Sequence, residues 1–143
     1  MSETISSMLL ILILSFVAVY DFREHEIPNI AILFLFLISA GKVIFNSKYG
    51  NLVVFVIWTV FFLAIYIFSE KKGIYLLGEG DIKLLSVLSL YFGFDFLRVL
   101  ILTCVSGFVA GFIAGIINKT YLKTYIPLAP FVLGASVLVE VVH

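Results

Sequence analysis

Gly78-Glu79-Gly80-Asp81 is the stretch that decides how the chain is organised, because it places a carboxylate between two long apolar runs. An ionisable side chain at the edge of a membrane-spanning segment is costly and usually has a function. Asp21 is the candidate partner, since it directly follows the first apolar run of the chain. The two carboxylates can act together only if the fold brings Asp21 and Asp81 to the same place.

The composition indicates an integral membrane protein. The 143 residues are 63% hydrophobic and only 13% charged, whereas a soluble domain carries about 25% charged residues. Membrane spans are helices or closed barrels, and long apolar runs favour helices. We therefore expect an all-α integral membrane protein with the lipid bilayer as its surroundings. The net charge of zero gives no indication of a nucleic-acid partner.

Six apolar runs predict a bundle of six transmembrane helices. They cover residues 5–20, 28–45, 52–68, 82–94, 99–117 and 127–142 and leave only short polar turns, so residues 1–143 form a single domain. No basic residue precedes the first run, and no small-residue cleavage site follows it, so we expect a retained span rather than a signal peptide. Pro28 suits the first turn of the second helix.

The basic residues around these runs predict the orientation. One side of the predicted bundle has six of them and the other has three: Arg23, Lys71, Lys72, Lys83, Lys119 and Lys123 against Lys42, Lys48 and Arg98. Basic residues are more frequent on the cytoplasmic side. We therefore expect a multi-pass protein of the plasma or inner membrane, with both termini outside. Asp21 and Asp81 then both lie at the cytoplasmic face.

Two aspartates on one side suggest an aspartyl protease dyad. Such a dyad shares one proton, so that one carboxylate activates water while the other carboxyl donates to the substrate carbonyl. Gly78 and Gly80 would let the backbone turn tightly and let a substrate strand approach. Two simpler interpretations stay open: Asp81 caps the helix that follows it, and Asp21 is an interfacial acid facing water.

Other polar residues on the same side allow further interpretations. Glu24, His25, Glu26 and Glu79 could form a metal site with the aspartates, but a solvated face is favoured and we expect no metal. Arg23 and Lys83 either stabilise a carboxylate or anchor at lipid phosphates, and the anchor is favoured. We assign no role to Glu79.

Small and apolar positions suggest packing rather than chemistry. Cys104, the one cysteine, is interpreted as a small buried hydrophobe. Gly107, Gly111 and Gly115 recur every four residues and form one close-packing helix face. That face favours packing within the bundle over a homo-oligomer seam.

Three motifs together resemble the type IV prepilin peptidase family. They are Asp21 followed by Ile27-Pro28-Asn29, then Gly78-Glu79-Gly80-Asp81 with Lys83, then the Pro127–Pro130 segment. This family is similar to the archaeal preflagellin peptidases and shares its G-x-G-D motif with the presenilins. The resemblance implies an intramembrane aspartyl endopeptidase with Asp21 and Asp81 catalytic and no cofactor. Its implied substrates are pilin-like precursors, cut on the cytoplasmic side of their hydrophobic helix.

The chain departs from the large bacterial members of that family. Those proteins carry a Cys-rich cytoplasmic domain between early spans, and many also methylate the new N-terminus. Here the first loop has nine residues and no cysteine, which argues against an N-methyltransferase. The chain is similar to the compact peptidases of tight-adherence (Flp) pili and to small archaeal peptidases. The alternatives are a small ion- or proton-coupled transporter that uses the same acids and a non-catalytic assembly subunit.

Overall fold

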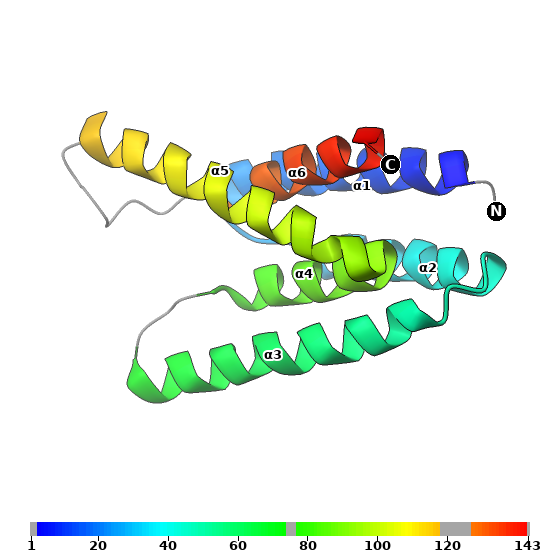
Figure 1. Ribbon diagram of the computed structural model, residues 1–143. Helices are drawn as coiled ribbons and strands as arrows, with labels where there is room; N and C mark the ends of the chain where they lie inside the picture. The colour runs from blue at the N-terminus through cyan, green and yellow to red at the C-terminus, as the bar shows by residue number, and fades with distance from the viewer. Residues whose placement is uncertain (1–2, 74–76, 118–126, 143) are drawn as a thin grey trace.

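The structure is a computed structural model that describes residues 3–73, 77–117 and 127–142. Within these ranges the chain is all-helical, with six α-helices, one 3₁₀-helix and no strand. The elements are α1 (Glu3–Glu24), α2 (Asn29–Phe45), α3 (Gly50–Lys72), α4 (Glu79–Phe92), η1 (Gly93–Asp95), α5 (Phe96–Ile117) and α6 (Ala129–Val142). Figure 1 labels the α-helices. The all-α prediction is confirmed for this part of the chain.

Three segments are long and apolar enough to cross a membrane. They are α1, α3 and the continuous run Glu79–Ile116, which contains α4 and most of α5. The helices α2 and α6 are apolar but shorter, with 17 and 14 residues. The structure therefore supports an apolar helical membrane protein. That all six helices cross the bilayer stays a prediction.

Two helix boundaries differ from the predicted ones in ways that matter for the aspartates. The helix α1 continues to Glu24 instead of ending at residue 20, so Asp21 lies inside its last turns. The helix α4 begins at Glu79, because Gly78 is extended (φ −71°, ψ 152°) and precedes the first helical residue. Asp81 is thus the third residue of α4 and not the N-cap residue that precedes the helix.

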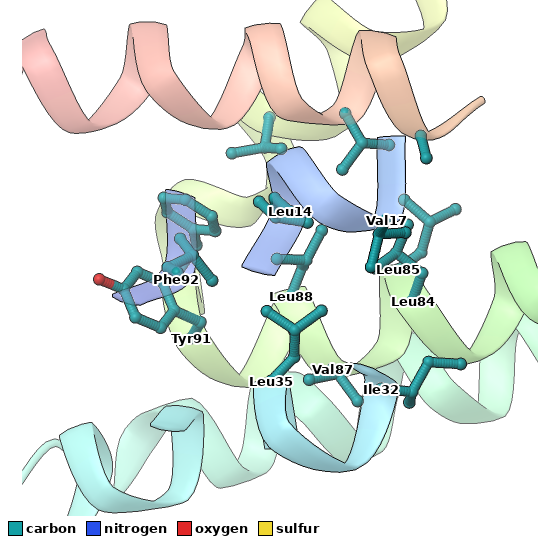
Figure 2. Close-up of a cluster of buried hydrophobic side chains, with 14 of the residues drawn as sticks. Leu14, Val17, Ile32, Leu35, Leu84, Leu85, Val87, Leu88, Tyr91 and Phe92 are labelled. Carbon is teal, nitrogen blue, oxygen red and sulfur yellow. The ribbon is translucent and has the colours of Figure 1, made fainter. Parts of the chain in front are cut away.

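The core is built around α4, which packs against α2 and α3, while α6 packs against α1 and α5. Every residue from Leu84 to Phe92 is buried. Figure 2 shows Leu14 and Val17 of α1 and Leu35 of α2 among the side chains around Leu88. Because its neighbours hold α4 on several sides, the start of this helix is fixed relative to α1 and α2.

The outer surfaces of the bundle are apolar, as expected for helices in lipid. Met8 and Leu12 of α1, Val56 of α3 and Phe108 of α5 are all more than half exposed. Soluble proteins rarely expose apolar surface on this scale. These helices therefore turn apolar side chains both to the core and to the surroundings, as membrane helices do.

Two predictions about α5 are tested by the structure. Cys104 is exposed, so its interpretation as a buried residue is wrong, because it lies on the outward face of an apolar helix. A Cβ at Gly107 would lie 3.8 Å from the Phe131 ring of α6. This glycine therefore faces another helix of the same chain, and a homo-oligomer seam through Gly107, Gly111 and Gly115 stays untested.

Candidate active site

Asp21 is a buried carboxylate with a defined hydrogen-bond donor. Asp21 is only 3% exposed, although it lies near the C-terminal end of α1. The backbone N–H of Ala129 donates to Asp21 Oδ2 at 3.0 Å. A carboxylate in such a place needs hydrogen bonds to offset its loss of water. The first residue of α6 provides one of them.

The start of α6 explains why Ala129 is the donor. The first N–H groups of a helix have no partner inside the helix, and they lie at its positive end. Ala129 is the first residue of α6 and is completely buried. Pro127 and Pro130 flank it and have no N–H of their own. The proline-rich segment therefore begins a helix beside Asp21 and leaves Ala129 to bond it.

Asp81 lies in the first turn of α4, and its carboxylate folds back over the start of the helix. It accepts a hydrogen bond from the backbone N–H of Gly78, which is one half of a capping box. A Cβ at Gly78 would come within 3.2 Å of Asp81 Oδ2. Glycine at position 78 therefore leaves room for this carboxylate.

Gly80 is explained by a contact with the loop between α1 and α2. A Cβ at this position would lie 3.0 Å from Cβ of Ile27, which is tighter than ordinary side-chain packing. The absent side chain lets Ile27 pack against the first turn of α4. In this way the loop that follows Asp21 is held against the helix that carries Asp81.

A chain of polar contacts joins α2 to the same turn of α4. Lys83 Nζ lies 2.5 Å from Glu79 Oε1 and donates to Asn29 Oδ1 at 3.3 Å. This contact gives Glu79 a partner, which the sequence did not predict. Because Lys83 and Glu79 are well exposed, the ion pair adds little to stability. The hydrogen bond from Lys83 to Asn29 ties the first residue of α2 to α4.

Both aspartates and the glycines of the motif line one open pocket of about 330 Å³ at one end of the bundle. Its lining is Asp21, His25, Glu26, Ile27, Asn29, Gly78, Glu79, Gly80, Asp81 and Lys83. The Asp21 carboxylate is close enough to act electrostatically on Asp81. Two ionised carboxylates in one partly buried pocket repel each other.

The structure gathers most of the predicted site residues but not all. Arg23 is exposed and lies outside the pocket lining. Pro28 is the residue before α2 and sets its start, with φ −67° and ψ 126°. In the described part of the chain, no three His, Cys, Asp or Glu side chains group as a metal site would require.

The family comparison gives the class of the protein. The fold and pocket define an apolar helical bundle that holds two aspartates together at one end. Residues 8–138 match the model of the type IV leader peptidase family, so the chain belongs to that family. This match confirms the resemblance to the prepilin peptidases and makes the protein a peptidase of a membrane-protein family. No curated protein and no solved structure matches the chain significantly.

Proposed function

We propose that this protein is an intramembrane aspartyl endopeptidase in which Asp21 and Asp81 are catalytic. The supporting observation is that both aspartates line one pocket, while neither forms an ion pair with any residue of the described ranges. A cation bound to either carboxylate would hold it ionised. With no such cation among the described residues, the pair can share a proton, which is the state that aspartyl proteolysis requires.

The proposed reaction uses one ionised and one protonated carboxyl group. The ionised group takes a proton from a water molecule as its oxygen attacks the scissile carbonyl carbon. The other group donates its proton to the carbonyl oxygen, which gives a gem-diol. The first group then gives its proton to the amide nitrogen, and the second takes a proton back from the gem-diol. The C–N bond breaks, which releases a new amine and a new carboxyl group and restores the pair.

The contacts of the two aspartates suggest which group has which role. A helix N-terminus and its N–H groups favour a negatively charged partner. Each aspartate has one such donor, Ala129 for Asp21 and Gly78 for Asp81. Their exposure separates them, and we assign the base role to Asp21, which is only 3% exposed. Asp81 lies at the more open part of the pocket and takes the role of the acid.

The substrates we propose are type IV pilin-like precursors, prepilins or preflagellins, whose leader is removed at the cytoplasmic face. A helical segment hides its carbonyls in internal hydrogen bonds, so the precursor must be extended at the scissile bond. The pocket opens beside the exposed Gly78, where backbone is accessible. The start of α1 and the end of α6 lie at the opposite end of the bundle (Figure 1), which is consistent with termini outside.

A co-expression experiment tests this function. Cells that make the protein and a pilin-like precursor should accumulate a shortened pilin, and the Asp21→Asn and Asp81→Asn variants should not. The intact mass of the product also tests for methylation, and we expect an unmethylated amine. Proton or cation flux in liposomes, with no shortening of any pilin-like precursor, would instead support the transporter and contradict the proposal.

A further inference from the structure

A second pocket, of about 410 Å³, lies at the end of the bundle opposite Asp21 and Asp81. Five helices and η1 contribute to its wall: Glu3, Lys42, Lys48, Gly50, Asn51, Tyr91, Phe92, Phe94, Asp95, Val139 and Glu140. The lining contains two lysines and three carboxylates. The pocket therefore presents charges of both signs at one edge of an apolar bundle.

Lys42 is the residue of this pocket whose ammonium can take a further acceptor. Its side chain is only 11% exposed, and its Nζ lies 3.8 Å from Glu140 Oε1, beyond hydrogen-bond distance. The ammonium also sits over the Tyr91 ring, 3.7 Å from its centre. No residue of the described ranges accepts a hydrogen bond from this nitrogen. A nearly buried ammonium has three donors, so an acceptor from outside the chain fits there.

The walls around Lys42 are held by fixed polar contacts. Ser7 Oγ donates to Glu140 Oε2 at 2.7 Å, and the Tyr91 hydroxyl donates to Ser7 Oγ at 3.3 Å. Lys48 pairs with Glu3 at 2.9 Å at the rim. These contacts keep Glu140 in place on one side of Lys42, so the pocket is built before any ligand enters.

An apolar groove of about 470 Å³ continues from this pocket between α5 and α6. Val139 lines both the pocket and the groove. Arg98, at the groove, pairs at 2.9 Å with Asp95 of the pocket. The rest of the groove is hydrocarbon, from Ile101, Leu102, Leu138 and Val142. A charged pocket joined to an apolar groove matches the two parts of a membrane lipid.

We propose that this end of the bundle binds one phospholipid with a phosphoethanolamine headgroup. Its phosphate accepts hydrogen bonds from Lys42, its primary ammonium lies beside Glu140, whose nearest cation is 3.8 Å away, and an acyl chain fills the α5–α6 groove. Phosphatidylglycerol has no cation for Glu140. Phosphatidylcholine has a cation without N–H donors. This inference does not depend on the proposed peptidase activity.

Lipid competition on the unmodified protein tests the proposal directly. The full chain is purified from membranes in mild detergent and exposed to an equimolar mixture of phosphatidylethanolamine, phosphatidylcholine and phosphatidylglycerol with identical acyl chains. Native mass spectrometry should show one retained lipid, mostly phosphatidylethanolamine. Equal retention of the three lipids, preference for either other lipid, or retention of none would overturn the proposal.

Two variants locate the bound lipid. Lys42→Gln should reduce retention about tenfold, as expected for loss of a hydrogen bond between charged groups. The matched control Lys71→Gln changes an exposed lysine of α3 away from both pockets and should retain lipid normally. Leu138→Trp fills the groove from a position that is 56% exposed and should also reduce retention, even if Lys42→Gln fails to fold. Normal retention in Leu138→Trp would overturn the proposed site.

Discussion

The two ends of this bundle treat charge in opposite ways. At one end, Asp21 and Asp81 share a pocket, and the nearby Lys83 is bound to Glu79 instead. At the other end, carboxylates and cations are paired, as in the contacts of Lys48 with Glu3 and of Asp95 with Arg98. Paired opposite charges are expected in any stable fold. Two like charges held together are costly, and this difference identifies the end where chemistry is expected.

The backbone around the two ends supports the same contrast. At the aspartate end, two helix starts supply N–H groups to carboxylates, from Ala129 to Asp21 and from Gly78 to Asp81. At the other end, Asn51 uses its side-chain amide to bond the carbonyl of Leu90 at 3.1 Å, which closes the end of α4. At the aspartate end the backbone thus binds two acidic side chains. At the other end the Asn51 side chain binds only a backbone carbonyl of α4.

The largest effect is expected from removing either carboxylate. Asp21→Asn and Asp81→Asn should each lower kcat by roughly 100- to 10,000-fold, the contribution of a general acid or base, and leave the helical content unchanged. Glu70→Gln, an exposed acid of α3 outside the pocket, is the matched control and should keep full activity. Cleavage of a purified precursor measures all three. Full activity of either aspartate variant would contradict the assignment of catalysis to the end that holds Asp21 and Asp81.

The next effect concerns the donor to Asp21. Ala129→Pro removes the N–H that bonds Asp21 at the first position of α6, where proline is well tolerated in helices. We expect kcat to fall about 10- to 100-fold, from loss of one hydrogen bond to a charged group, with KM little changed. Ala129→Gly keeps the N–H and should retain most activity. Equal losses in both variants would point to packing rather than to the hydrogen bond.

A smaller effect is expected from filling the space at Gly80. Gly80→Ala places a Cβ 3.0 Å from Cβ of Ile27 and should cost about 1–3 kcal/mol of unfolding free energy, as overpacking does. Ile27→Ala in the same chain should recover part of that loss. Gly41→Ala, where a Cβ meets nothing within 4 Å, is the control and should be tolerated. Thermal unfolding in detergent compares the stability of these variants. Equal stability of Gly80→Ala and Gly41→Ala would contradict the proposed clash with Ile27.

The smallest effect is expected at Lys83. Lys83→Gln removes the contacts to Glu79 and Asn29, but exposed ion pairs contribute only about 0.2–1 kcal/mol. We expect activity to fall about two- to fivefold, since 1.4 kcal/mol corresponds to a factor of ten. Added salt should reduce the difference from the unmodified protein. Lys71→Gln is the control, and a loss as large as that of Asp81→Asn would mean that Lys83 acts in the chemistry itself.

Much of the fold could be predicted from the sequence because apolar runs in a membrane protein directly mark helices. The second helix begins within a residue of its predicted start, since Pro28 fixes that start. The boundaries near the aspartates could not be predicted in the same way. Hydropathy ends a helix at its first charged residue, whereas α1 continues through Asp21 to Glu24 because backbone hydrogen bonds do not require apolar side chains.

The site was predicted as residue types but not as contacts. The motifs named Asp21, Asp81 and the glycines, and the structure places these residues around one pocket. Ala129 was missed because its contribution is a backbone N–H, which carries no side-chain signal. The available signal was the pair of prolines around it, since a helix that starts there leaves an unpaired N–H. The contact of Gly80 with Ile27 depends on tertiary packing and could not be read from spacing.

The pH dependence of kcat/KM for cleavage of a purified precursor tests the central claim most directly, because that claim is one proton shared by Asp21 and Asp81. A pair that needs one ionised and one protonated member gives a bell-shaped profile, with activity lost on both the acidic and the alkaline side. We predict such a profile for the unmodified protein and the same shape for Glu70→Gln. Activity that rises with pH to a plateau and has no alkaline decline would contradict the account.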